Sequence, residues 1–184
     1  MKKVVIFNGS PRMDGNINTI LDTIAKGVRD TGAEAKYYTL FKMKFMACQS
    51  CFACRVKGDC IINDELHEAL QHVKEADAVV IGSPIYMMQV TDPVKNLYDR
   101  LYPLMDMECR PRYGNKKFVA VYSQGSDDPN LYRSYFDYTA AMYPAYGFDL
   151  VDTLVCTKAT DPEAAENDRD LKIRAYELGQ SLVL

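Results

Sequence analysis

The sequence lacks long hydrophobic runs, an excess of one charge and the side-chain sets of hydrolytic catalysis. No apolar stretch approaches the roughly 20 residues that a helix needs to cross a bilayer. The 22 Lys and Arg residues nearly balance the 25 Asp and Glu residues, which argues against a general nucleic-acid binder. No Ser/His/Asp set and no paired carboxylates stand in a recognisable catalytic context. We therefore expect neither a membrane nor nucleic acid as a partner.

Cysteine is scarce outside one short segment. Four of the six cysteines stand close together in the sequence: Cys48, Cys51, Cys54 and Cys60. A secreted disulfide scaffold spreads its cysteines and carries a signal peptide, whereas this chain begins Met-Lys-Lys and enters a short apolar run at once. We expect a cytoplasmic, reduced protein with one local thiol cluster. Cys109 and Cys156 stand alone in apolar context and are expected to be buried.

Short apolar runs alternate with helical periodicity along the chain. Runs rich in β-branched and aromatic residues predict buried strands, and two more mixed runs suit edge strands. The predicted strands cover residues 4–7, 34–40, 78–81, 118–122 and 149–156. Apolar residues at helical spacing predict helices over 17–28, 66–73, 94–101, 130–143 and 171–182, the third of them capped by Asp92. This fivefold alternation predicts an α/β fold with a doubly wound parallel sheet.

One segment fits neither pattern. A chain of 184 residues predicts a single domain over 1–184, since domains average about 150 residues. Residues 41–62 insert the thiol cluster between the second strand and its helix. Long insertions of this kind are often functional.

Ligands of open α/β sheets bind beyond the carboxyl ends of the strands, which directs attention to the loops there. The first loop, residues 8–19, is rich in small and hydroxyl residues, and its backbone N–H groups can ring a phosphate at the start of a helix. Arg12 can add a charge-assisted bond. The loop contains neither GxxxxGK[ST] nor GxGxxG, so it indicates neither a nucleoside triphosphate nor a dinucleotide. A plain turn between strand and helix is the alternative.

Two further loops suit a planar ligand. Residues 82–91 include Pro84, Tyr86 and two methionines, which offer a flat, polarizable surface without catalytic acids. The alternative is a hydrophobic loop that packs on a neighbouring helix or subunit. Residues 123–126 carry small and amide groups that can bond the edge of a ring.

Three sets of residues carry a resemblance to a known family: Gly9-Ser10-Pro11-Arg12 with Gly15-Asn16, Gly82-Ser83-Pro84-Ile85-Tyr86, and Lys95 with Asp99-Arg100. Together they resemble the flavodoxin-like NAD(P)H-dependent FMN reductase family, and the compact cysteines resemble those of its iron–sulfur flavoprotein branch. The resemblance runs from residue 3 to about residue 126. It implies a flavodoxin-like, five-stranded sheet of order 2-1-3-4-5 with helices on both faces, FMN as cofactor and NAD(P)H as co-substrate.

The resemblance also implies roles for individual residues. The FMN phosphate would be held by Ser10, Arg12, Asn16, Ile17 and Asn18. The isoalloxazine and ribityl chain would be lined by Pro84, Ile85, Tyr86, Met87 and Met88. The far edge of the ring would be approached by Ser123, Gln124 and Gly125. This family often has threonine where Ile17 stands, and small or aromatic residues are commoner than the two methionines.

The spacing Cys48-x2-Cys51-x2-Cys54-x5-Cys60 allows four interpretations. Two CxxC steps can wrap three thiolates around a 4Fe-4S cluster, with the fourth arriving slightly later, and this agrees with the compact motif of iron–sulfur flavoproteins. Zinc uses the same ligands, but its CxxC pairs usually stand ten or more residues apart. Redox-active thiols are the third, with Arg55 and Lys57 lowering a neighbouring thiol pKa. Reduced cysteines that pack a loop are the fourth.

The leading hypothesis is an FMN-dependent oxidoreductase that takes hydride from NAD(P)H and passes electrons to a quinone, a flavin or another small molecule. The cofactor supplies the chemistry, so no side chain is assigned a catalytic role. The alternatives are an iron–sulfur electron carrier with ferredoxin-type partners and a zinc-stapled FMN-binding module. The resemblance implies a homodimer or homotetramer. The tyrosines of residues 132–146 are either a packing face or a subunit interface.

Overall fold

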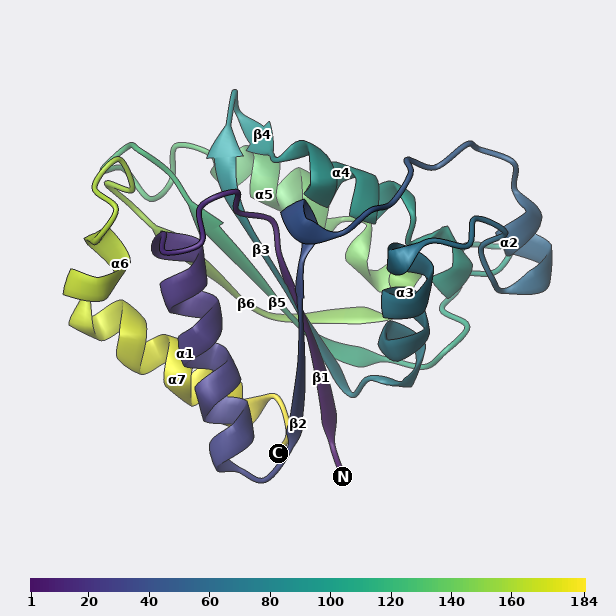
Figure 1. Cartoon of the computed structure of the whole chain (residues 1–184), viewed down its shortest axis with the longest axis horizontal. Helices are drawn as coiled ribbons and strands as arrows, with labels where there is room; N and C mark the ends of the chain where they lie inside the picture. Colours follow the sequence, from purple (N-terminus) through teal and green to yellow (C-terminus); the bar gives the residue numbers. More distant parts are fainter.

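Five parallel strands form the centre of the protein in a computed structural model that describes residues 1–184 (Figure 1). They are β1 (Lys3–Asn8), β2 (Glu34–Thr39), β3 (Ala78–Tyr86), β5 (Lys116–Ser123) and β6 (Phe148–Cys156). Their spatial order is β2-β1-β3-β5-β6. Counted among the parallel strands alone, this is the predicted order 2-1-3-4-5, so the flavodoxin-like topology is confirmed. The short antiparallel strand β4 (Gln89–Val90) pairs with the end of β3 and was not predicted.

Helices cover both faces of the sheet (Figure 1). One face carries α1 (Asn16–Asp30), α6 (Ala164–Asn167) and α7 (Arg169–Ser181), and the other carries α3 (Glu65–Glu75), α4 (Asp92–Asp99) and α5 (Arg133–Ala140). Because side chains alternate along a strand, Val4 and Ile6 enter the core beneath α1, whereas Val5 and Phe7 enter the core beneath α3 and α4. The remaining helical pieces are η1 (Leu40–Lys42), α2 (Ala53–Lys57), η2 (Tyr102–Leu104) and η3 (Tyr143–Tyr146).

Two helix boundaries differ from the prediction. The helix expected over 130–143 is α5 alone, followed by the 3₁₀ turn η3, where Pro144 cannot donate a backbone hydrogen bond. The N-cap of α4 is Thr91 and not Asp92, and the Thr91 hydroxyl donates to Gly9 O at 2.8 Å. This bond fastens the loop after β1 to the start of α4.

The aromatic series of residues 132–146 divides between the core and the surface. Phe136, Tyr143 and Tyr146 are buried in the core cluster beneath α3, α4 and α5, which supports a packing face. Tyr138 is exposed. Of the two isolated cysteines, Cys156 is buried as expected, in the core cluster on the α1 face of the sheet. Cys109 is exposed because it lies in a surface turn, which corrects the expectation that it is buried.

Helices α1 and α7 approach each other at two glycines. A Cβ atom on Gly27 would lie 2.3 Å from Tyr176 O, and one on Gly179 would lie 2.2 Å from Ile24 O. Any side chain larger than hydrogen would therefore push the helices apart. None of the helices combines the length and apolarity needed to cross a bilayer.

Candidate functional site

The strand register brings the predicted loops to one edge of the sheet. Asn8 of β1 lies beside Gly82 of β3, and Pro84 of β3 lies beside Ser123 of β5. A pocket of about 250 Å³ opens there. Its lining comes from four segments at the carboxyl ends of the strands: Ser10, Arg12, Gly15, Asn16, Ile17, Pro84, Ile85, Tyr86, Ser123, Gln124, Gly125, Ala159 and Thr160. We call it the strand-end pocket.

Three predicted residues lie outside this lining. Asn18 is buried in the first turn of α1, and its Oδ1 atom has no hydrogen-bond partner. Met87 and Met88 are 95% and 68% exposed. They form the two-residue turn between the paired residues Tyr86 and Gln89, with φ angles of 45° and 69°. The turn reverses the chain beyond the pocket, so the methionines belong to the surface of a hairpin.

Sequence reasoning missed Ala159 and Thr160, which follow β6. The signal was present, because β6 is parallel to its neighbours and its following loop must reach the same edge. Asn16 fixes this loop. Its Nδ2 donates to Asp161 O at 2.8 Å and Ala159 O at 3.5 Å, and its Oδ1 accepts from Ala165 N at 2.8 Å. The Asn16 side chain is thus a tether between α1 and the loop after β6.

The start of α1 offers unpaired backbone donors to the strand-end pocket. The first i→i−4 bond of the helix runs from Thr19 N to Gly15 O at 3.1 Å, which leaves the N–H groups of Asn16, Ile17 and Asn18 without a partner in the helix. No side chain caps this end, and no acidic residue stands in its first turn. Such an end attracts an anion.

The preceding loop is already shaped by its own hydrogen bonds. Ser10 N donates to Asn8 Oδ1 at 2.8 Å, and Arg12 N donates to Ser10 Oγ at 3.1 Å. The Ser10 hydroxyl in turn donates to Arg12 O at 3.2 Å. Ser10 therefore holds the backbone at Arg12, while the exposed Arg12 guanidinium supplies the positive charge at the pocket.

The opposite wall holds a buried acceptor. Gln124 is 2% exposed, and its Nε2 donates to Asp128 O at 2.6 Å. Its Oε1 atom is buried without a partner. An unpaired buried acceptor is costly, so a ligand N–H group at this place would be stabilised. A phosphate site at one end and a ring-edge acceptor at the other fit a flavin mononucleotide.

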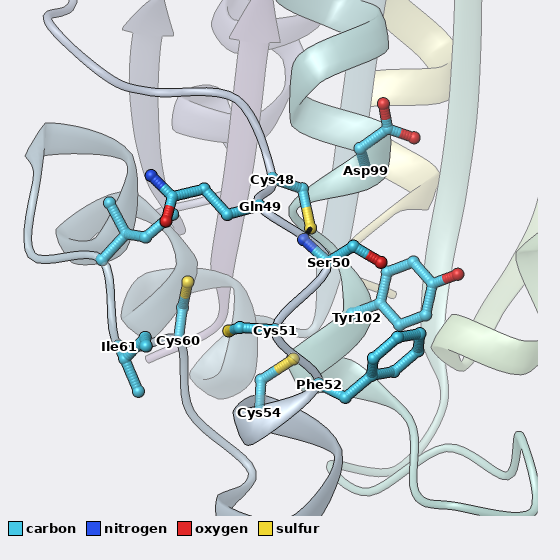
Figure 2. Close-up of a pocket in the computed structure, with 11 residues that line it drawn as sticks. Cys48, Gln49, Ser50, Cys51, Phe52, Cys54, Cys60, Ile61, Asp99 and Tyr102 are labelled. Carbon is cyan, nitrogen blue, oxygen red and sulfur yellow. Dashed lines mark hydrogen bonds between the residues drawn. The ribbon is translucent and has the colours of Figure 1, made fainter.

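All four clustered cysteines line a second pocket of about 210 Å³. Figure 2 shows their sulfur atoms around one hollow, with Phe52 and Tyr102 at its side. Ser50 and Phe52 have left-handed backbone conformations, with φ angles of 53° and 56°, which curl the chain between the cysteines. Asp99 and Tyr102, which were not predicted to lie near the cysteines, complete the wall. We call it the thiol pocket.

The chemistry of the thiol pocket fits a thiophilic metal centre, because four thiols line one cavity, although the ligands are not preassembled. No group of three or more cysteine, histidine or carboxylate side chains is arranged to hold a metal ion. Cys51 is exposed and the other three cysteines are half-buried. Ser50 N donates to Cys48 Sγ at 3.4 Å. Burial, followed by the neighbouring thiols of Cys60, Cys48 and Cys51, raises the pKa of Cys54.

Arg55 does not activate a clustered thiol in the way predicted. Its Nη2 donates to Met107 O at 2.8 Å and to Cys109 Sγ at 3.5 Å, away from the cluster. For Cys54 the predicted lowering of the thiol pKa is wrong, because burial and the other thiols raise it.

Comparison with known proteins identifies the class. The model of the NADPH-dependent FMN reductase family matches residues 2–129. The chain belongs to this family of oxidoreductases, as its fold and its strand-end pocket lead one to expect. The resemblance carried by residues 9–16 and by the Gly82–Tyr86 segment is therefore confirmed.

Curated relatives narrow the comparison to one branch. The chain is 27% identical over 163 residues to an iron–sulfur flavoprotein of Methanocaldococcus jannaschii, covering 88% of this chain and 79% of that protein. It is 37% identical over 123 residues to an iron–sulfur flavoprotein of Archaeoglobus fulgidus, covering 67% of this chain and 59% of that one. A second Archaeoglobus fulgidus relative of the same name is 37% identical, and only 46% of it is covered.

Solved structures share the fold over the whole chain. An NAD(P)H:quinone oxidoreductase from Methanothermobacter marburgensis superposes with a TM-score of 0.77 at 17% identity, covering 98% of both chains. An FMN-dependent NADH-azoreductase from Bacillus anthracis, solved in complex with FMN, gives a TM-score of 0.73 at 15% identity and covers both chains fully. At these identities the likeness concerns the fold alone.

Proposed function

We propose that the protein is an FMN-dependent oxidoreductase that consumes NAD(P)H and passes electrons to a small-molecule acceptor such as a quinone or a flavin. The observation that carries this proposal is the pairing, in one pocket, of an uncapped helix start with the unpartnered Oε1 of Gln124. When bound, FMN supplies the redox chemistry by accepting hydride from NAD(P)H and releasing electrons to the acceptor.

The chain's own residues would bind and orient the cofactor. The N–H groups at Asn16 and Ile17, with the charge of Arg12, hold the phosphate. Pro84, Ile85 and Tyr86 provide the apolar wall, and Gln124 accepts a hydrogen bond from the ring edge. Tyr86 lines the pocket and is 46% exposed, so it would form the solvent-facing part of the wall that holds the cofactor.

The test is binding and reduction of FMN by the purified chain under anaerobic conditions. We expect micromolar or tighter FMN affinity, and bleaching of the flavin band near ~450 nm on addition of NADH or NADPH. Comparing the two nucleotides at equal concentration identifies the preferred donor. A chain that is folded by circular dichroism but does not retain FMN would contradict the proposal.

A second candidate function is one-electron transfer through a 4Fe-4S cluster, with ferredoxin-type proteins as partners. The thiol pocket favours it, because Cys48, Cys51, Cys54 and Cys60 line a single cavity, and the relatives carry the name iron–sulfur flavoprotein. Iron and sulfide analysis of anaerobically purified protein tests it. About four irons per chain would support a cluster, and zinc would support a structural site. If neither iron nor zinc is found, the cysteines are reduced thiols that pack a loop.

A homodimer or homotetramer is also proposed. The exposed side chains of Met87, Met88 and Tyr138 lie at the rim of the molecule beyond β3 and on α5, where a second copy would remove them from water. Light scattering on the FMN-loaded protein measures the assembly. A monomer at micromolar concentration would contradict it.

A further inference from the structure

A buried arginine fastens both ends of the cysteine segment to the end of α4. Arg100 is 1% exposed and follows the last residue of that helix. Its Nη1 donates to Met46 O at 2.7 Å, just before the first cysteine of the cluster, and its Nη2 lies 3.4 Å from Ile62 O, just after the last. One guanidinium group thus bridges the residues just before and just after the segment that forms the thiol pocket.

Asp64 completes this fastening. Its carboxylate accepts from Arg100 Nη1 at 2.8 Å and from Arg100 Nη2 at 3.0 Å, a bidentate pair. The same carboxylate accepts from Met46 N at 3.0 Å and from His67 N at 3.0 Å, where it caps α3. The entry of the segment, its exit, α3 and α4 therefore meet at a single ion pair.

The ion pair stands directly behind the thiols. Asp99 and Tyr102, on either side of Arg100 in the chain, line the thiol pocket. Burial lowers the pKa of Arg100, but the hydrogen bond to Asp64 and the further interactions with Asp64 and Cys60 outweigh it and hold that pKa above its usual value. Arg100 Nε is buried and has no partner.

We infer that Arg100, with Asp64, is the positioning residue of the thiol pocket, holding Cys48 and Cys60 close enough to ligate one metal centre. The inference rests on the proposed metal-binding role of the four thiols and is independent of FMN. The curl of the chain at Ser50 and Phe52 shapes the segment from within, and the bridge from Met46 to Ile62 and Asp64 joins its two ends. Partners behind metal ligands of this kind typically set metal affinity by roughly 10–100-fold.

Cobalt(II) binding tests the inference without a turnover assay. The full-length chain, reduced and free of metal, is titrated with Co²⁺, and the thiolate charge-transfer absorption reports ligation by sulfur. Arg100→Gln is expected to weaken Co²⁺ binding by roughly 10–100-fold, while FMN affinity stays unchanged. Arg100→Lys restores part of the loss, because a single ammonium group cannot span all three acceptors. Asp64→Asn removes the charged partner but keeps an acceptor, and it should also give an intermediate loss.

Val28→Ala is the matched control for general destabilisation. Val28 is a buried residue of α1, on the other face of the sheet, and lines neither pocket. Unchanged Co²⁺ affinity in Arg100→Gln overturns the inference. The inference is also overturned if Val28→Ala loses as much Co²⁺ affinity as Arg100→Gln when the two variants have similar melting temperatures. If Arg100→Gln does not fold, the Arg100→Lys and Asp64→Asn variants decide the question.

Two further outcomes separate this inference from the flavin proposal. Wild-type protein that binds FMN but shows no thiolate–Co²⁺ absorption overturns the role of Arg100 and leaves the oxidoreductase standing. Wild-type protein that ligates Co²⁺ but does not bind FMN overturns the oxidoreductase proposal and leaves the role of Arg100 standing.

Discussion

The two pockets of this protein are built in different ways. Strand ends and the first turn of a helix form the strand-end pocket, so its polar groups are fixed by regular backbone structure. The thiol pocket is formed by an irregular segment with two left-handed residues, and its walls are completed by side chains from the end of α4. The first geometry follows from the fold, whereas the second depends on a few long side chains that hold a loop in place.

This difference has a consequence for mutation. A substitution in the strand-end pocket removes one contact from a scaffold that remains, because β1, β3 and β5 are buried and paired on both sides. A substitution at Arg100 or Asp64 removes the bridge between the two ends of the cysteine segment. The following changes, ordered from the largest expected effect to the smallest, test whether the two pockets are separable.

Replacing two thiols should abolish metal binding and leave the flavin untouched. In Cys48→Ser/Cys60→Ser, the pair contributed by the two ends of the segment is lost, and two cysteines cannot complete a four-ligand site. We expect no bound iron in anaerobically purified protein and FMN affinity within about twofold of wild type, measured by fluorescence titration. The control is Cys109→Ser, an exposed cysteine outside the pocket. A large loss of FMN would show that the pockets are coupled.

Removing the polar side chains of the first loop should have the opposite effect. Ser10→Ala/Arg12→Ala deletes the charge beside the start of α1 and the hydroxyl that holds the backbone at Arg12. A lost charged hydrogen bond corresponds to about 1.5–3 kcal/mol, so FMN should bind roughly 10–100-fold more weakly. Arg29→Ala, an exposed arginine at the far end of α1, is the control. Unchanged FMN affinity in the double variant would refute this phosphate site.

Cutting the tether from α1 to the loop after β6 should reduce both stability and flavin binding. Asn16→Ala leaves Asp161 O and Ala165 N without their partner, a loss of about 1–3 kcal/mol in the free energy of unfolding. Urea denaturation of the FMN-free protein measures it. Asn115→Ala, which loses only a surface hydrogen bond to Asp149, should change stability little. Equal effects in the two variants would argue against the tether.

Removing the backbone strain at the turn between β3 and β4 should stabilise the protein slightly. Met87 and Met88 occupy left-handed positions of a two-residue turn, which Asn and Gly adopt readily. Met87→Asn/Met88→Gly is expected to raise the free energy of unfolding by about 1 kcal/mol without changing FMN or Co²⁺ binding. Weaker FMN binding would instead place the methionines against the isoalloxazine, as the sequence predicted.

The sequence predicted what depends on short-range pattern. The apolar runs at 4–7, 78–81 and 118–122 became buried strands, and the loops that follow them meet at one edge because parallel strands end together. Contacts between residues far apart in the chain leave no pattern in the sequence. Nothing in the spacing of residues shows that Asn16 bonds to Asp161, or that Arg100 bridges Met46 and Ile62. The hairpin turn at Met87 and Met88 was not predicted, because β4 has only two residues and is too short to carry a periodic pattern.

The close approach of α1 and α7 constrains the order in which the protein matures. Ile24 and Val28 of α1 belong to the same buried cluster as Ala175 and Leu182 at the other end of the chain. During synthesis from the amino end, the strand-end loop and α1 emerge long before α7 exists to cover them. The part of α1 that faces α7 therefore stays uncovered until nearly the whole chain has been made. We expect FMN to bind tightly at the first turn of α1 only once the last helix has docked.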